Sequence, residues 1–364
     1  MAADENITTR LPAETIDMIL DLFCAHHVKW RKLVWPAAKD ASEAAMEKAD
    51  FAVLAALCRV NRRFNGLATP RLYHSLTNSM TASKWLLIAR TLIVRPELAD
   101  LVRHLTLLDD LKASHIHKLY PGEVLDYFAE KAAEFPALLL MPQSHNLVLS
   151  LWMGGWGSGR QIDGPLAIMT SLCRKIETLD CIAYNYASVF AFCSPSSVES
   201  LRATFGRAIA NGWNGPLSLK YLVPLVQAAP KLELLRIERT NEVDRYGYVE
   251  QLQSVTTLEL RLCYMDIEDL ATTLRAFPKL VKLAYQCPTA PPMGAGQFSP
   301  QEVVGCVLEH APNLKEFELN IESYTQYQTF SKSDIQDAKR ALESHGIRCE
   351  FIVGYEGSKP VFAE

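Results

Sequence analysis

The 364-residue sequence has no large charge of either sign and no long apolar run. Its formal net charge of −4 provides no broad basic field of the kind that binds nucleic acid by displacing counterions from phosphates. The N-terminus lacks a basic start followed by an apolar block, and proline or a charged residue interrupts every later apolar run well before membrane-spanning length. We therefore expect no nucleic-acid partner, no secretion and no membrane insertion.

Paired metal-binding or redox cysteines are also missing. The nine cysteines form an odd count, contain no C-x-x-C pair and lie mostly inside apolar segments, which is typical of reduced core thiols in a cytoplasmic or nuclear protein. Cys24, His26 and His27 lie close together, and His115 and His117 form an H-x-H pair. Neither group has a second ligand pair at zinc-site spacing, so we expect no metal.

The familiar nucleotide-binding and hydrolase motifs are absent from the one glycine-rich segment, residues 153–164. Its glycines fit neither G-x-x-x-x-G-K-[ST] nor G-x-G-x-x-G, and Ser158 lacks the G-x-S-x-G frame. We expect a surface loop, no cofactor and no enzymatic activity, although an enzyme that uses this loop stays an alternative. Rigid aromatic side chains beside glycine-rich turns can anchor a partner, which makes Trp156 and Trp213 candidates for target binding.

What is present near the N-terminus is a helix pattern in LPAETIDMILDLF, residues 11–23. Pro12 suits the first helical position, and Glu14 lies where the helix dipole favours an anion. Apolar residues form one stripe, while two others, Met18 and Leu22, add apolar surface on another side; the stripe contains Ile16, Ile19, Leu20 and Phe23. Such a helix must be covered from more than one side.

A second helix is expected over residues 51–64, with Asp50 as its cap and Gly66 near its end. Its apolar positions recur at helical spacing, at Val53, Leu54, Leu57, Val60 and Phe64. Arg62 and Arg63 would then lie in the last turn of this helix, and the chain would restart at Pro70. Residues 25–49 form an insertion between the two helices, with a helical, alanine-rich second half. So small a module makes a marginal core and leaves apolar surface for a partner.

The ordered combination of LPAETIDMIL and LAALCRVNRRFNGLATPRLYHSL resembles the F-box motif, especially its fungal form, over about residues 9–76. The resemblance implies binding to the Skp adaptor of SCF-type cullin–RING ubiquitin ligases. Carried over by position, the contact or supporting residues are Leu11, Pro12, Ile16, Ile19, Leu20, Leu54, Leu57, Val60 and Phe64. The insertion between the helices, before Leu54 and Leu57, departs from the compact motif.

A second pattern recurs in the rest of the chain. Three segments place a proline in register between a helix end and a Leu-x-x-Leu/Phe-x-apolar strand: 225–237, 273–285 and 307–319, with Pro230, Pro278 and Pro312. Weaker copies extend the series, so that the aligned positions are Leu179, Leu201, Leu235, Leu258, Leu283 and Phe317. Each step has room for a strand and a helix, and no unit can bury its apolar face without a neighbour.

These repeats resemble the irregular leucine-rich repeats found behind F-boxes. The predicted fold class is α/β: an F-box-like helical module over residues 1–78 and a leucine-rich-repeat-like domain over 79–364, a curved array of seven or eight parallel strands with helices. An ordinary α/β domain with evenly spaced strands is the alternative. Residues 331–355 predict an amphipathic helix, a stop at Gly346 and one more strand.

Residues between the core-facing leucines would form one surface of this array. They are mixed acids, bases and amides: Asp180, Arg202, Arg236, Glu238, Glu259, Arg261, Gln286, Glu318, Asn320 and Glu322. Such a surface could match a partner's charge pattern. Together with the two tryptophans, the candidates for target binding are Arg202, Arg236, Glu238 and Arg261; solvated strand ends are the alternative.

The resemblance implies a non-catalytic substrate receptor. The N-terminal helices would dock on the Skp adaptor, and through it on the cullin and RING subunits, while the array would hold an unknown protein target for ubiquitin conjugation. The alternative is a leucine-rich-repeat scaffold for protein–protein interaction that assembles no ligase. The sequence identifies neither the target nor a requirement for its phosphorylation.

Overall fold

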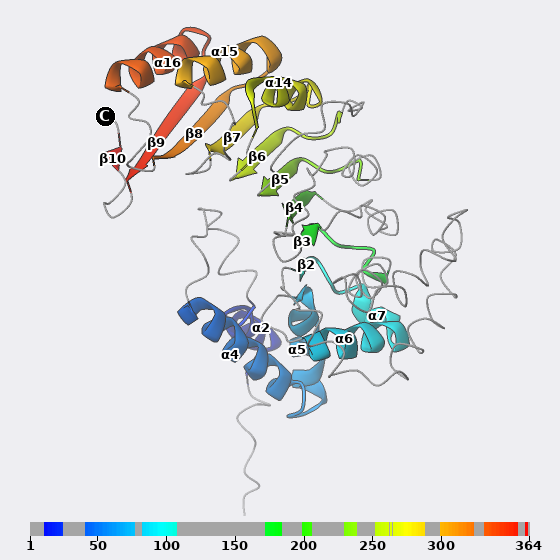
Figure 1. The fold of residues 1–364 in the computed structure, drawn as a ribbon. Coiled ribbons are helices and arrows are strands. Elements are labelled where there is room, and N and C mark those ends of the chain that lie inside the picture. The colour runs from blue at the N-terminus through cyan, green and yellow to red at the C-terminus, as the bar shows by residue number, and fades with distance from the viewer. Residues whose placement is uncertain are drawn as a thin grey trace, which may run out of the picture. The chain divides into compact units, whose positions relative to one another are not determined.

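The structure is a computed structural model with mixed α/β architecture (Figure 1). It describes residues 11–24, 41–76, 82–107, 172–183, 199–205, 229–238, 252–261, 263, 265–287, 299–323, 331–355 and 361–362. Its contacts divide the chain into unit 1, residues 1–176, and unit 2, residues 177–364. The domain boundary predicted at residues 78/79 stays a prediction. None of the helices among the described residues combines the length and the apolar character needed to cross a membrane.

Unit 1 is mainly helical in its described part. Its helices are α2 (Ala13–Asp21), α4 (Ala41–Leu57), α5 (Arg62–His74), α6 (Ala82–Val94) and α7 (Pro96–Ala99). Two short parallel strands, β1 (Ser75–Leu76) and β2 (His104–Leu107), pair Ser75 with His104 and Leu76 with Leu105. Strand β1 follows α5 directly, so the pairing ties the end of that helix to the segment after α7.

The single helix predicted over 51–64 is wrong, because the chain breaks there into two helices. Helix α4 begins at Ala41, in the alanine-rich part of the insertion, and ends at Leu57. Asn61 then adopts an extended conformation, and its side chain accepts a hydrogen bond of 2.9 Å from the backbone N–H of Phe64. This cap starts α5, which runs through Gly66 and Pro70. The apolar spacing continued across the break because both helices pack on one core.

Two other sequence expectations for this region change with the break. Arg62 and Arg63 lie in the first turn of α5 and not in a last turn. Asp50 lies inside α4 and caps nothing at its start. Independently of the break, Pro12 is the N-cap of α2 and not its first helical residue, which is Ala13. The arginines moved because the N-cap signal of Asn61 outweighed the apolar periodicity, whereas Asp50 lies inside α4 because that helix already begins at Ala41.

Unit 2 contains a sheet whose strands lie in chain order (Figure 1). The strands are β3 (Thr178–Ala183), β4 (Ser200–Phe205), β5 (Leu234–Glu238), β6 (Thr257–Arg261), β7 (Lys282–Cys287), β8 (Glu316–Ser323), β9 (Arg348–Tyr355) and β10 (Val361–Phe362). Strands β3 to β9 are all parallel, and β10 is antiparallel to β9. Parallel neighbours require a crossover between consecutive strands, as the repeat pattern predicted.

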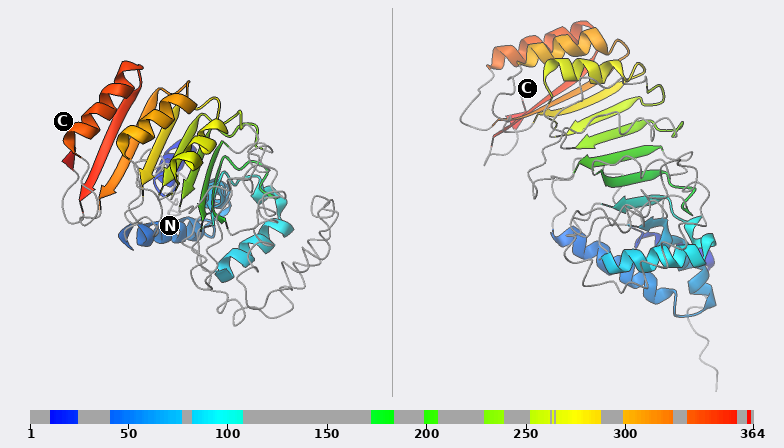
Figure 2. Two further views of the ribbon diagram at one scale, coloured as in Figure 1. Left: turned by 45° about the horizontal axis from the view of Figure 1, so that its top comes forward. Right: turned by 45° about the vertical axis from the view of Figure 1, so that its right-hand side comes forward.

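Three helices of unit 2 lie on the same face of this sheet, as the two views in Figure 2 show. They are α14 (Ile267–Arg275), α15 (Pro300–His310) and α16 (Lys332–Ser344). Serine caps begin the last two helices: Ser299 and Ser331 each form a capping box, with Glu302 and Asp334 respectively.

The sheet register follows the aligned leucine positions. Leu179 pairs with Leu201, and each later aligned residue pairs with the next along Leu235, Leu258, Leu283 and Phe317. Cys349 continues the row opposite Phe317. Leu235, Leu258 and Leu283 are fully buried. The row is therefore a continuous apolar spine across seven strands.

The three prolines of the repeat occupy equivalent turns. Each is the second residue of a turn in which the N–H of the buried leucine two positions later donates to the carbonyl before the proline, at 3.0–3.1 Å. The next strand begins four residues after each proline, at Leu234, Lys282 and Glu316. Proline suits this second position because its fixed φ matches the turn.

The C-terminal segment matches the prediction and adds one strand to it. Helix α16 ends at Ser344, Gly346 has a positive φ of 74°, and β9 follows at Arg348. Among the described strands after position 79, β3 to β9 are seven parallel strands, and the two-residue β10 is an antiparallel addition that the prediction did not include. The two-residue β10 was missed because it is too short to show an alternating pattern.

Candidate functional site

The helices α2, α4 and α5 enclose a small apolar core. Ile16 and Leu20 of α2, Leu54 of α4 and Ala68 of α5 are buried together. Partly buried side chains complete the core: Leu11, Phe23, Leu57, Cys58, Phe64, Leu67 and Leu72. The predicted adaptor residues Ile16, Leu20 and Leu54 are thus available for packing inside the module and not for contact on its surface.

A second set of apolar side chains on α2 points away from this core. Met18 is 72% exposed, Leu22 68% and Ile19 44%. Met18 and Leu22 are four residues apart and therefore lie on one side of the helix, next to Ile19. Exposed apolar side chains gathered on one helix face indicate a surface for a partner. We call Met18, Ile19 and Leu22 the α2 surface.

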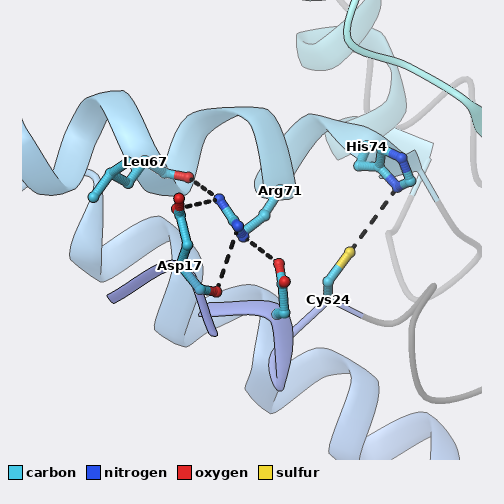
Figure 3. Close-up of polar contacts among 6 residues, drawn as sticks. Asp17, Cys24, Leu67, Arg71 and His74 are labelled. Carbon is cyan, nitrogen blue, oxygen red and sulfur yellow. Dashed lines mark hydrogen bonds and ion pairs between the residues drawn. The ribbon is translucent and has the colours of Figure 1, made fainter. Parts of the chain in front are cut away.

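Arg71 of α5 fixes which side of α2 faces outward (Figure 3). Its Nη1 lies 3.0 Å from Asp17 Oδ1, and its Nε donates to Asp21 Oδ1 at 2.7 Å. The same guanidinium donates to the carbonyl oxygens of Leu67, at 2.9 Å, and Asp17, at 3.4 Å. Asp17 and Asp21 are one helical turn apart, so one planar side chain holds two successive turns of α2.

The turn before α2 is held from the same helix. Arg63 Nη2 donates to the carbonyl oxygen of Leu11 at 2.5 Å. Leu11 packs against the core, whereas Pro12 is exposed. Arg63 is therefore more than a solvated helix end, which was the expectation for both arginines. The contact presents Pro12 beside the start of α2.

The remaining predicted adaptor residues divide in the same way. Leu57 and Phe64 are partly buried against the core, and Val60, in the turn between α4 and α5, is 57% exposed. Adaptor contact at these positions stays a prediction. The sequence reasoning left Met18 and Leu22 out of the site, although it noted that they add a second apolar side to α2, which was the signal that could have included them.

A thiol and two imidazoles lie where α2 and α5 end. Cys24 Sγ is 4.0 Å from His74 Nδ1 (Figure 3), and the His74 and His104 rings meet edge to face at a centroid distance of 5.1 Å. Among the residues that the structure describes, no group of three His, Cys, Asp or Glu side chains is placed to hold a metal ion. His26, His27, His115 and His117 lie outside those residues. The contacts join α2, α5 and β2 within unit 1.

Buried thiols elsewhere are unsuited to nucleophilic chemistry. Burial, with a smaller effect of Asp100, raises the pKa of Cys173 to about 12. Burial, followed by Glu309, raises the pKa of Cys306 to about 11. Both thiols are therefore protonated at neutral pH, and the thiolate is the reactive form.

The second candidate surface lies in unit 2, on strands β5 and β6. Arg236 and Arg261 are only 5% and 6% exposed. Arg236 Nε donates to Glu259 Oε2 at 2.6 Å, and Arg261 Nη2 donates to the same oxygen at 3.1 Å. These residues were expected to be a surface of mixed charge. The structure brings the three together as a nearly buried charged cluster.

Other predicted target-binding residues are placed by backbone register alone. Arg202 pairs with Arg236 across β4 and β5, and Glu238 pairs with Arg261 across β5 and β6. Gln286 is 7% exposed and pairs with Arg261 on one side and Asn320 on the other. Trp156, Trp213 and the loop over 153–164 lie outside the described residues.

The chain matches no protein-family model and no curated protein sequence.

Proposed function

We propose that this protein is the substrate-recognition subunit of an SCF-type cullin–RING ubiquitin ligase. In this proposal the helices α2, α4 and α5 form an F-box that binds the Skp adaptor, and the leucine-rich-repeat-like strands hold the target protein. The chain performs no bond chemistry of its own. Ubiquitin is transferred by other subunits of the complex.

The observation that supports this proposal most directly is the α2 surface. The core of the helical module is already filled by Ile16, Leu20, Leu54 and Ala68, yet three large apolar side chains of α2 stay in water. Complete burial of such a side chain contributes roughly 1.5–3 kcal/mol, so covering the exposed 44–72% of all three contributes a few kcal/mol to binding. A helix that packs on one side and exposes apolar side chains on another suits a docking helix.

The Leu-Pro turn supports the same proposal. Leu11 packs inward, Arg63 binds its carbonyl oxygen, and Pro12 is left exposed at the N-cap of α2. In the alternative scaffold, the F-box-like segment would instead pack against residues after 80. Ile16 is buried by side chains of α2, α4 and α5, all of which precede residue 80.

The test is binding of the full chain to purified Skp adaptor, measured by isothermal titration calorimetry. Met18→Ser/Leu22→Ser should weaken binding at least tenfold without lowering the unfolding temperature, because both side chains are exposed. Leu11→Ala/Pro12→Ala should also weaken binding, by loosening the turn before α2.

The matched control removes two exposed apolar side chains from another helix. Leu87 and Val94 of α6 are 61% and 66% exposed, and Leu87→Ser/Val94→Ser should bind the adaptor as the wild type does. If the folded wild-type chain fails to bind the adaptor, the ligase proposal is wrong and the interaction scaffold replaces it. If the α6 variant weakens binding as much as the α2 variant, the docking surface is not confined to α2.

A further inference from the structure

The charged cluster of Arg236, Glu259 and Arg261 lies on the face of the sheet opposite α14, α15 and α16. Cys349 shows which face of the sheet carries the helices, because its thiol lies 3.9 Å from the carbonyl oxygen of Lys339 in α16. Cys349 pairs with Phe317 and so continues the leucine row, the aligned residues from Leu179 to Phe317, which lies on the same face. Side chains alternate between faces along a strand. Arg236 follows Leu235, and Glu259 follows Leu258, so both point to the other face.

Arg236 uses few of its hydrogen-bond donors. Its side chain is 6% exposed, and among the described residues Glu259 is the one acceptor that it binds, through Nε. A guanidinium has five N–H donors, so the terminal nitrogens of Arg236 have donors left for another acceptor. Arg261 makes further contacts besides that with Glu259, so Arg236 is the residue with donors to offer.

We propose that Arg236 binds a carboxylate of the target protein, the side chain of an aspartate or glutamate in an extended segment laid on this face. With Nε held by Glu259, the two terminal nitrogens present the parallel N–H pair that matches a carboxylate. This inference rests on the proposed function, in which unit 2 holds the target.

A carboxylate fits this site better than a phosphate does. Glu259 Oε2 lies 2.6 Å from Arg236 Nε, and its side chain is 13% exposed. Glu259 offsets one of the two arginines, so the cluster keeps one net positive charge, which a singly charged anion balances without leaving excess negative charge in a nearly buried site. A carboxylate carries one negative charge, whereas a phosphate monoester carries about 1.5 to 2 at neutral pH.

The experiment selects binders for the full-length chain from a phage library of random twelve-residue peptides, and then measures synthetic peptides by fluorescence anisotropy. We expect the selected peptides to share an Asp or Glu, and Arg236→Gln to weaken their binding at least tenfold. Arg348→Gln is the matched control, because Arg348 is 81% exposed on β9, and it should bind as the wild type does. Selected peptides without acidic residues, or peptides that bind Arg236→Gln as tightly as wild type, would overturn the proposal.

Glu259→Gln separates recognition from folding. It removes the repelling carboxylate and leaves Arg236 charged, so acidic peptides should bind it at least as tightly as wild type; loss equal to that of Arg236→Gln would contradict the assignment. Replacing the acidic residue of the peptide by phosphoserine should weaken binding, and tighter binding would exclude a carboxylate site. Adaptor binding is measured on the same preparations. Lost adaptor binding with intact, Arg236-dependent peptide binding would refute the ligase proposal alone.

Discussion

The two units differ in where their large apolar side chains lie. Every large apolar side chain that is exposed among the described residues belongs to unit 1: Met18, Ile19, Leu22, Val53, Val60, Leu87 and Val94. In the described part of unit 2, the inner sides of the helices are buried instead, as are Leu179, Leu235, Leu258, Leu283 and Phe317 of the sheet. The described residues of unit 2 thus have their large apolar side chains inside, whereas those of unit 1 keep some of them in water.

This difference indicates that the units have different kinds of interface. A surface of exposed apolar side chains gains free energy when a partner covers it, as in the binding of one protein by another's helix face. The nearly buried Arg236, Glu259 and Arg261 of unit 2 gain little from further apolar cover, but discriminate between partners by charge and geometry. This contrast is what the proposed function requires, in which unit 1 binds a constant adaptor and unit 2 selects a target.

The largest expected effect on stability tests whether the apolar side chains of unit 2 are buried and those of the α2 surface in unit 1 are exposed. Leu258 is fully buried in the middle of the leucine row. Leu258→Ala should lower the free energy of unfolding of unit 2 by about 2–5 kcal/mol, because it removes apolar contacts and leaves a cavity. Urea unfolding followed by circular dichroism measures this change.

The comparison variant is Leu22→Ala in unit 1. Since Leu22 is 68% exposed, the loss should stay within about 0.5 kcal/mol. Equal losses for the two substitutions would mean that exposed Leu22 already has a packing role, and the contrast between the units would disappear.

Sequence reasoning predicted unit 2 in more detail than unit 1, for a physical reason. Its signals were local and repeated: a turn proline, then an apolar residue at every second position. Three copies fix a register that one copy cannot, and the six aligned positions from Leu179 to Phe317 are paired neighbours in the sheet. Short β10 has no copy in the chain, and it was missed.

Unit 1 offered one copy of each signal, and two of them conflicted. The apolar spacing at Val53, Leu57, Val60 and Phe64 continues without interruption, whereas Asn61 is a strong N-cap residue. The cap prevailed and the helix broke. The sequence indicated which apolar residues of α2 belong to the candidate site, but not which of them are exposed. Ile19 and Leu20 are neighbours in the sequence, yet only Leu20 is buried. Which side chains face outward depends on how Arg71 holds α2.

A smaller effect is expected for Arg71→Met, which keeps the apolar stem of the side chain and removes its contacts with α2. Asp17 and Asp21 are each 41% exposed, so screening limits the loss of stability to about 1 kcal/mol. Adaptor affinity should fall at least threefold, because α2 is then free to rotate and Met18, Ile19 and Leu22 are no longer presented as one surface.

Two measurements separate these roles of Arg71. Hydrogen exchange should accelerate at the amides of α2 more than at those of α5 in Arg71→Met. Arg62→Met is the matched control, because Arg62 is exposed in the first turn of the same helix, and it should change neither exchange nor affinity. Unchanged exchange in α2 together with unchanged affinity would show that core packing alone orients the helix.

An effect that is absent at neutral pH and appears only above about pH 9 tests what the units share, which is a core that keeps thiols protonated. The pKa of Cys306 in unit 2 is raised from 9.0 to about 11, chiefly by burial, so its contribution to stability is complete below pH 9 and is lost as the pH rises toward 11. The free energy of unfolding should therefore fall in this window by at most about 1.4 kcal/mol per pH unit for this group. Cys306→Ala should remove the contribution of this thiol to the fall in the free energy of unfolding. Cys173→Ala in unit 1 should remove a contribution that extends toward pH 12. Urea unfolding between pH 8 and 11 measures both, and a pH dependence left unchanged by Cys306→Ala would mean that this thiol is ionised as readily in the folded chain as in the unfolded one. If the thiols of both units are protonated, the two units do not differ in this property of their cores. The difference between the units then lies in their surfaces, on which the two binding proposals depend.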